Sequence, residues 1–174
     1  MSLLRKGYVQ VYTGNGKGKT TAALGLALRA SGAGLKVYIQ QFMKNGNYSE
    51  IKALRGIYNI KVSRCGNGPF ITGKPAIADI ECAENGFEDA KGSIFSGKYD
   101  LVVLDEINTA MKIGLLAPRN VINIIKKKPK NVELVLTGRG CPPSIMKIAD
   151  LVTEMREIAH PYNKGIVARR GIEY

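Results

Sequence analysis

The stretch that decides the fold is Thr13-Gly14-Asn15-Gly16-Lys17-Gly18-Lys19-Thr20-Thr21, which stands between a short β-rich run and an Ala- and Leu-rich run. Its ending, Gly18-Lys19-Thr20, is that of a phosphate-binding loop. In such a loop, glycines let backbone N–H groups converge on phosphate oxygens, and the following helix adds the positive end of its dipole. Lys19 would supply a point charge, and the Thr20 hydroxyl would hold Mg²⁺. We therefore predict that residues 14–21 bind a nucleoside triphosphate.

The loop departs from the usual pattern at its first glycine. The usual pattern places glycine five residues before Gly18, where this chain has Thr13, so the first turn is shifted to Gly14. A dinucleotide-binding loop is one alternative, but its G-x-G-x-x-G pattern would need glycine where Lys19 stands. That alternative also expects an acidic residue near the end of the second strand, where Gln40-Gln41-Phe42 stands instead. A plain turn is the other alternative, and the triphosphate loop is favoured over both.

Beyond the loop, short β-rich runs alternate with longer helical patterns. The expected strands are Tyr8–Tyr12, Lys36–Phe42, Ile60–Arg64, Leu101–Leu104, Val132–Leu136 and Leu151–Met155. The expected helices are Lys19–Ser31, Pro75–Ser96 and Pro118–Lys128. Gly86 stands inside the second of these helices, where a glycine can interrupt the helical pattern. The alternation predicts an α/β fold of the P-loop NTPase or RecA-like type, with a mostly parallel sheet and helices on both faces.

A second signal is the apolar run Leu101–Leu104 followed by two carboxylates, Asp105 and Glu106. In phosphate-loop proteins such a strand is expected beside the loop, with its acid facing Mg²⁺ directly or through water. An acid at a strand end can also simply cap the next helix, but the loop upstream favours the metal role. Arg139 ends another apolar run. Ligands of parallel sheets bind at the carboxyl ends of strands, so one interpretation is that Arg139 reaches a phosphate there. The other interpretation is that Arg139 lies in a surface turn.

Composition indicates one globular domain over residues 1–174. With 45% hydrophobic and 23% charged residues, the chain is ordinary for a soluble protein. No apolar run is long enough for a membrane span or a signal peptide. The three cysteines, Cys65, Cys82 and Cys141, are far apart in the sequence, so a zinc site is not expected. Unpaired thiols fit a reducing compartment. We therefore expect a cytoplasmic protein.

The chain is strongly basic, with 26 Lys and Arg against 14 Asp and Glu and a formal net charge of +12. Basic surfaces bind nucleic acids and attract acidic partners. The basic residues are spread along the sequence, however, and the densest cluster, Lys126–Lys130, is typical of a solvated helix end followed by proline. Charge alone therefore does not favour a nucleic acid as the partner.

Together these motifs resemble those of the ATP:corrinoid adenosyltransferases, and the resemblance covers nearly the whole chain. The matching segments are TGNGKGKTTAALGLALRASGAG at 13–34, Gln41-Phe42 with Lys44, VVLDEIN at 102–108, LTGR at 136–139, ADLVTEM at 149–155, His160, and GIVARRGIEY at 165–174. The shifted loop is this family's own form. The departure at Thr13 therefore supports the resemblance.

The resemblance implies a reaction and a role for four residues. In this family Co(I) of a reduced corrinoid attacks the 5′ carbon of ATP and inorganic triphosphate leaves, in adenosylcobalamin biosynthesis or salvage. The family holds ATP in the direction opposite to ordinary phosphate-loop ATPases. By similarity Lys19 and Glu106 are catalytic, Glu106 and Thr20 hold Mg²⁺, and Asp105 supports the metal site from behind.

The resemblance also implies further contacts and partners. Asn15 and Arg29 match family positions near the nucleotide. Phe70 matches an aromatic that fills the lower face of the corrinoid, where the family removes the lower ligand to leave four-coordinate cobalt. The family's second aromatic, a tryptophan two residues later, is Thr72 here, and the chain contains no Trp. The family further implies a homodimer and a reduced flavoprotein as electron donor.

Two other function classes are weighed against this interpretation. A RecA-like ATPase or nucleic-acid binding module would suit the basic charge, and a small-molecule kinase would suit the loop. The products separate them, since both alternatives release ADP whereas an adenosyltransferase releases triphosphate and an alkylated corrinoid.

Overall fold

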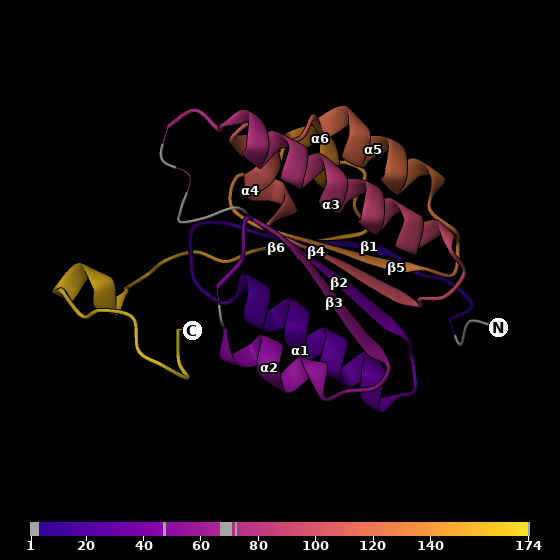
Figure 1. The fold of residues 1–174 in the computed structure, drawn as a ribbon, viewed down its shortest axis with the longest axis horizontal. Helices are drawn as coiled ribbons and strands as arrows, with labels where there is room; N and C mark the ends of the chain where they lie inside the picture. Colours follow the sequence, from indigo (N-terminus) through magenta and orange to yellow (C-terminus); the bar gives the residue numbers. More distant parts are fainter. Residues whose placement is uncertain (1–3, 47, 67–70, 72, 174) are drawn as a thin grey trace.

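The structure, a computed structural model, describes residues 4–46, 48–66, 71 and 73–173. Its centre is a six-stranded sheet with every neighbouring pair parallel, in the order β3-β2-β4-β5-β1-β6 (Figure 1). The strands are β1 (Val9–Thr13), β2 (Val37–Phe42), β3 (Ile60–Cys65), β4 (Leu101–Asp105), β5 (Glu133–Thr137) and β6 (Leu151–Glu154). The predicted α/β class is confirmed, and the sheet is wholly parallel.

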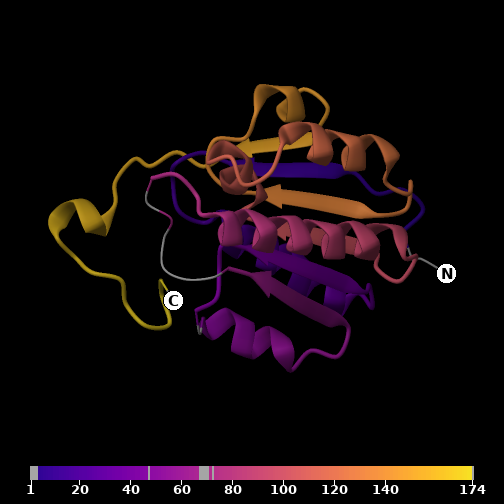
Figure 2. The same cartoon turned by 45° about the horizontal axis from the view of Figure 1, so that its top comes forward.

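Helices cover both faces of the sheet. One face carries α1 (Lys19–Gly32) and α2 (Ser49–Arg55), and the other carries α3 (Ile77–Phe95), α4 (Ile107–Lys112), α5 (Pro118–Lys127) and α6 (Pro143–Met146) (Figures 1 and 2). A 3₁₀ turn, η1 (Pro161–Lys164), lies in the C-terminal tail. In the part of the chain that the structure describes, no helix is both long and apolar enough to cross a bilayer.

The alternation of side chains along β4 decides which carboxylate faces which helix layer. Leu101 and Val103 pack in the core beneath α1, whereas Val102 and Leu104 pack in the core beneath α3. Because successive strand residues point to opposite faces, Asp105 points to the α1 side. On β5, Val135 belongs to the same α1 core.

The strand that ends at Asp105, β4, does not pair with the strand that enters the glycine-rich loop, because β5 lies between β4 and β1. All the strands are parallel, so the ends of β1, β2, β4 and β5 still meet at one edge of the sheet. Thr13, Phe42, Asp105 and Thr137 end these strands, and ligands of open α/β folds bind at such an edge.

Gly86 does not interrupt α3, which runs unbroken from Ile77 to Phe95. A Cβ built on Gly86 would lie 2.6 Å from the sulfur of Cys65 at the end of β3. This glycine is therefore explained by the close approach of helix and strand, and its cost to the helix is about 1 kcal/mol relative to alanine. The short helices α2, α4 and α6 were not predicted from the sequence, because each has fewer than eight residues and too few turns to show a helical period.

The C-terminal tail leaves the sheet after β6 and extends beside the body of the molecule (Figures 1 and 2). The four residues of β6 are all exposed, and so are large apolar side chains further along the tail. Those of the tail are Ile158, Tyr162, Ile166, Val167 and Ile172.

Candidate functional site

The glycine-rich loop between β1 and α1 is shaped by two glycines with positive φ. Gly14 has φ 95° and Gly18 has φ 111°, a region that side-chain-bearing residues rarely adopt. A Cβ on Gly14 would lie 2.4 Å from the carbonyl oxygen of Met155, just beyond β6. The N–H of Gly16 donates to that same carbonyl at 2.7 Å. The loop therefore rests on the end of β6, and the shifted first turn at Gly14 is required by this close packing.

Lys19 lies folded into the loop. Its ammonium donates to the carbonyl oxygens of Gly14 at 2.8 Å and Gly16 at 2.6 Å, and the residue is only 7% exposed. Burial lowers the pKa of Lys19, and the nearby charge of Glu106 partly opposes this effect. A phosphate oxygen in the loop would offer this buried ammonium a negatively charged acceptor in place of neutral carbonyls.

Asp105 is fully buried and accepts four hydrogen bonds. Its Oδ1 accepts from the hydroxyls of Thr20 at 2.9 Å and Thr137 at 2.7 Å, and its Oδ2 accepts from Gln41 Nε2 at 2.9 Å and Lys44 Nζ at 2.8 Å. Burial alone would raise the pKa of the Asp105 carboxyl, but the Lys44 charge and these hydrogen bonds lower it. The carboxylate is thus ionised, saturated with donors, and engaged in orienting the Thr20 hydroxyl.

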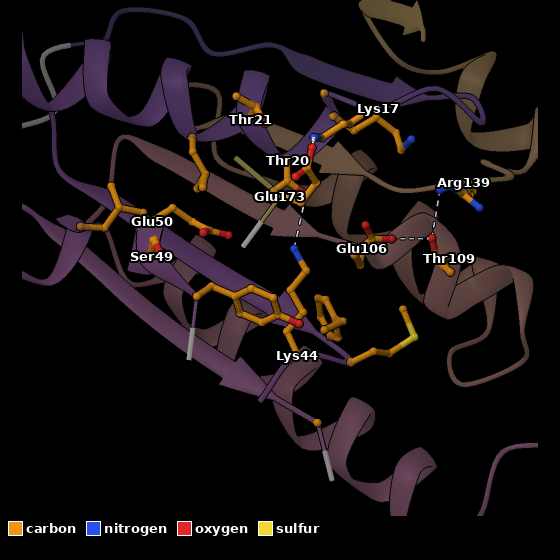
Figure 3. Close-up of a pocket in the computed structure, with 18 of the residues that line it drawn as sticks. Lys17, Thr20, Thr21, Lys44, Ser49, Glu50, Glu106, Thr109, Arg139 and Glu173 are labelled. Atoms are coloured by element: carbon orange, nitrogen blue, oxygen red, sulfur yellow. Dashed lines mark hydrogen bonds and ion pairs between the residues drawn. The ribbon is translucent and has the colours of Figure 1, made fainter. Parts of the chain in front are cut away.

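Glu106 lies differently from its neighbour, in the wall of a cavity. It caps α4 with φ 65°, a left-handed conformation that costs a non-glycine residue about 1–2 kcal/mol. Its N–H donates to the Thr137 hydroxyl at 2.9 Å, and its Oε2 accepts from the Thr109 hydroxyl at 2.6 Å. The Thr109 oxygen in turn accepts the N–H of Arg139 at 2.9 Å (Figure 3). These bonds hold the Glu106 carboxylate at the edge of the sheet, where it lines the cavity.

These residues meet around one cavity of about 1030 Å³. Of the residues predicted to bind nucleotide or metal, those that line it are Asn15, Gly16, Lys17, Gly18, Lys19, Thr20, Thr21, Glu106 and Arg139. Gly14 takes part through its carbonyl, and Asp105 lies behind Thr20. Of the two interpretations of Arg139, its place in the cavity wall favours a ligand contact.

One predicted residue, Arg29, is not brought into this arrangement, and a second, Phe70, has no described position. Arg29 lies exposed in the last turn of α1, outside the cavity lining, where its charge acts on Tyr12. Phe70 lies outside the residues that the structure describes, although Gly66 and Ile71 on either side of it line the cavity. The roles of Arg29 and Phe70 therefore stay predictions.

Lys44 and Glu173, two charged residues of the site, were given no role from the sequence. Lys44 contacts both Thr20 and Asp105. Glu173 forms an ion pair with Lys17 at 2.8 Å (Figure 3). Glu173 also accepts from Arg169, and these hydrogen bonds lower the pKa of Glu173 to about 2. The tail thereby returns to the glycine-rich loop. The signal for both residues was their presence in the matching segments, since their distance from the loop in sequence hides the contact.

The oxygen donors at this edge suit a small hard cation that is shared with phosphates. Among the described residues, no group of three or more His, Cys, Asp or Glu side chains is placed to hold a metal. The Thr20 hydroxyl and the Glu106 carboxylate face the cavity. One or two such protein oxygens, completed by phosphate oxygens and water, are what Mg²⁺ uses at nucleotide sites, so the residues present fit this ion.

Comparison with known proteins agrees with this geometry. Residues 5–174 match the family described as ATP:corrinoid adenosyltransferase BtuR/CobO/CobP. The corrinoid adenosyltransferase of Pseudomonas aeruginosa is 36% identical over 171 residues, which cover 97% of this chain and 84% of that protein. The corrinoid adenosyltransferase of Escherichia coli K12 is 32% identical over 169 residues, covering 97% and 86%. An uncharacterised Nostoc protein is 38% identical over 171 residues; the match covers 89% of this chain but only 45% of that longer protein. The chain belongs to the ATP:corrinoid adenosyltransferase family.

Proposed function

We propose that this protein transfers the 5′-deoxyadenosyl group of ATP to Co(I) of a reduced corrinoid in adenosylcobalamin biosynthesis or salvage. The Co(I) electron pair forms the Co–C bond, and the electrons of the C5′–O bond leave with inorganic triphosphate. The observation that carries the proposal is the convergence of Lys19, Thr20 and Glu106 on one cavity in a chain of this family.

The loop residues would bind and stabilise the leaving triphosphate. The first backbone N–H groups of α1 and the ammonium of Lys19 are positive groups fixed at the base of the cavity. As the C5′–O bond breaks, negative charge grows on the triphosphate, and preorganised donors stabilise that charge without reorganising. Lys17 and Arg139 add two cations to the cavity wall.

Thr20 and Glu106 would hold Mg²⁺, and Asp105 would orient Thr20. The ion, when bound, neutralises part of the triphosphate charge. The Thr20 hydroxyl donates its proton to Asp105, so its oxygen directs a lone pair away from that carboxylate. Because no water has to be deprotonated in this reaction, the site requires no general base.

The nucleotide would lie with its adenosine directed towards the corrinoid, opposite to the direction used in ordinary phosphate-loop ATPases. The cavity continues past Thr20 to the ends of β2 and β3 and to α2 and α3, where apolar side chains line it. Among these are Phe42, Met43, Leu54, Ile71 and Ala83. This apolar part suits a second, largely apolar substrate, and Phe70 would join it against the lower face of the corrinoid.

The protein would work as a cytoplasmic homodimer that receives electrons from a reduced flavoprotein. A second copy is supported by the exposed apolar side chains of Leu151 and Val152 on β6, an edge strand paired on one side only. Sedimentation equilibrium tests this: a dimer is expected, and a monomer at micromolar concentration would contradict it.

The activity is tested by mixing the protein with ATP, Mg²⁺ and chemically reduced cobalamin. The visible spectrum should change from that of Co(I) to that of an alkylated corrinoid, at a rate proportional to enzyme. An unchanged corrinoid with ADP formation would instead support the RecA-like ATPase or kinase alternative.

A further inference from the structure

Lys44 is directed into the site by an unusual backbone. Met43, just beyond β2, has φ 57°, so the chain turns sharply before Lys44. The N–H of Lys44 donates to the carbonyl of Cys65 at 3.2 Å, and a Cβ on Gly66 would lie 2.7 Å from the Lys44 nitrogen. Contacts between the ends of β2 and β3 therefore fix this backbone, although Met43 has to adopt an unfavourable left-handed conformation.

The Lys44 ammonium occupies the space beside the Thr20 hydroxyl. It lies 3.4 Å from Thr20 Oγ1 (Figure 3). It also lies 2.8 Å from Asp105 Oδ2 and 5.7 Å from the centre of the Tyr48 ring. The Lys44 side chain is 17% exposed. A cation over an aromatic face and against a buried carboxylate is held by both, so the position is well defined.

The charges of the two neighbouring carboxylates, Asp105 and Glu106, are balanced by two lysines of the site. Asp105 and Glu106 contribute two negative charges, and Lys19 and Lys44 contribute two positive ones, each lysine acted on by both carboxylates. Affinity for a divalent cation rises with the number of uncompensated carboxylates around it. With Lys44 on Asp105, Glu106 is the one of these two neighbouring carboxylates that lines the cavity and is left to bind a cation.

We propose that Lys44 is a positioning residue that makes metal binding depend on the nucleotide. By neutralising Asp105, Lys44 keeps this carboxylate from binding the ion directly and reserves it for orienting Thr20. The divalent ion then binds with the triphosphate, whose oxygens supply the missing negative charge. This inference rests on the proposed use of Thr20 and Glu106 as Mg²⁺ ligands.

The test is binding of Mn²⁺ to the purified protein without nucleotide, followed by the electron paramagnetic resonance signal of free Mn²⁺. The wild type should bind Mn²⁺ weakly alone and tightly with ATP. Lys44→Met removes the positive charge that compensates Asp105. This variant should therefore bind Mn²⁺ on the order of tenfold more tightly than the wild type without ATP, and Mg²⁺ should compete with Mn²⁺. Lys44→Arg, which keeps the charge, should behave as the wild type.

The matched control is Lys61→Met, which removes an exposed lysine from β3 and should leave Mn²⁺ binding unchanged. The double variant Lys44→Met with Asp105→Asn should lose the gained affinity, which would locate the new site at Asp105. Lys44→Gln provides a second neutral variant if Lys44→Met does not fold.

Two results would overturn the proposal. They are tight Mn²⁺ binding by the nucleotide-free wild type, and no gain in Mn²⁺ affinity in the folded neutral variants. If the variants without this gain also lose metal-free ATP binding, Lys44 contacts phosphate instead. None of these measurements involves a corrinoid, so their failure is separable from failure of the adenosyl transfer itself.

Discussion

The hydroxyl of Thr20 donates a 2.9 Å hydrogen bond to Asp105, 85 residues further along the chain. The two residues meet although β5 lies between β1, which leads to Thr20, and β4, which ends at Asp105. The contact exists because α1 lies on the same face of the sheet as the Asp105 side chain. The two adjacent carboxylates therefore have different environments: Asp105 is buried behind Thr20, whereas Glu106 faces the cavity.

Because Glu106 is the carboxylate that faces the cavity, Glu106→Gln is predicted to change the dependence of adenosylation on the Mg²⁺ concentration. The amide keeps the shape of Glu106 and removes its charge, so the affinity for Mg²⁺ in the presence of ATP should fall by roughly tenfold or more. Adenosylation should recover in part as Mg²⁺ is raised, as followed by the initial rate at fixed ATP. Glu84→Gln, an exposed position on α3, is the control. An unaltered Mg²⁺ dependence would make Glu106 only a helix cap.

The glycine-rich loop was predictable from the sequence because its residues act within one short segment. The loop, the following helix and the paired carboxylates of β4 all stand as expected at one edge of the sheet. The contact of Lys44 with Asp105 could not be predicted, because it depends on the left-handed Met43 and on the pairing of β2 with β4. The order of β5 between β1 and β4 was likewise hidden, since strand order is set by long-range packing.

The ion pair between Lys17 and Glu173 predicts a variant with increased affinity. Glu173→Gln removes the carboxylate that holds Lys17, so the lysine becomes free to bind phosphate. Ion pairs near the surface are weak and are screened by salt, so the affinity for inorganic triphosphate should rise by no more than roughly fivefold. Isothermal titration calorimetry at low salt measures this against Glu84→Gln. Weaker triphosphate binding would instead mean that Glu173 stabilises the loop in its binding form.

The buried thiols predict a simple pattern of chemical labelling. Burial raises the pKa of Cys65 to about 12 and that of Cys141 to about 11. At pH 8 the Cys65 thiol is therefore almost entirely protonated, and the thiolate is the reactive form. Iodoacetamide followed by mass spectrometry should label Cys82 first, and labelling of the other two should accelerate as pH rises. Early labelling of Cys65 in the folded protein would contradict its burial.

The net charge of +12 predicts a dependence on salt that differs between electron donors. Flavodoxin-type reductants are usually acidic, so long-range attraction would speed their encounter with this protein. Such attraction is screened beyond about 8–10 Å near physiological ionic strength. Adenosylation coupled to the flavoprotein should fall steeply with added salt, and adenosylation driven by a small chemical reductant should fall much less. Equal salt slopes would remove the docking hypothesis and leave the enzyme assignment standing.

The central claim, transfer of the adenosyl group with triphosphate as the leaving group, is tested most directly by ³¹P NMR of the products formed from ATP and chemically reduced cobalamin. The wild type should give inorganic triphosphate in equal amount to the alkylated corrinoid. Folded Lys19→Ala should lose roughly 10²–10³ in rate, because the charge growing on the triphosphate loses its buried ammonium. ADP and phosphate as the products, or near wild-type turnover by Lys19→Ala, would contradict the account.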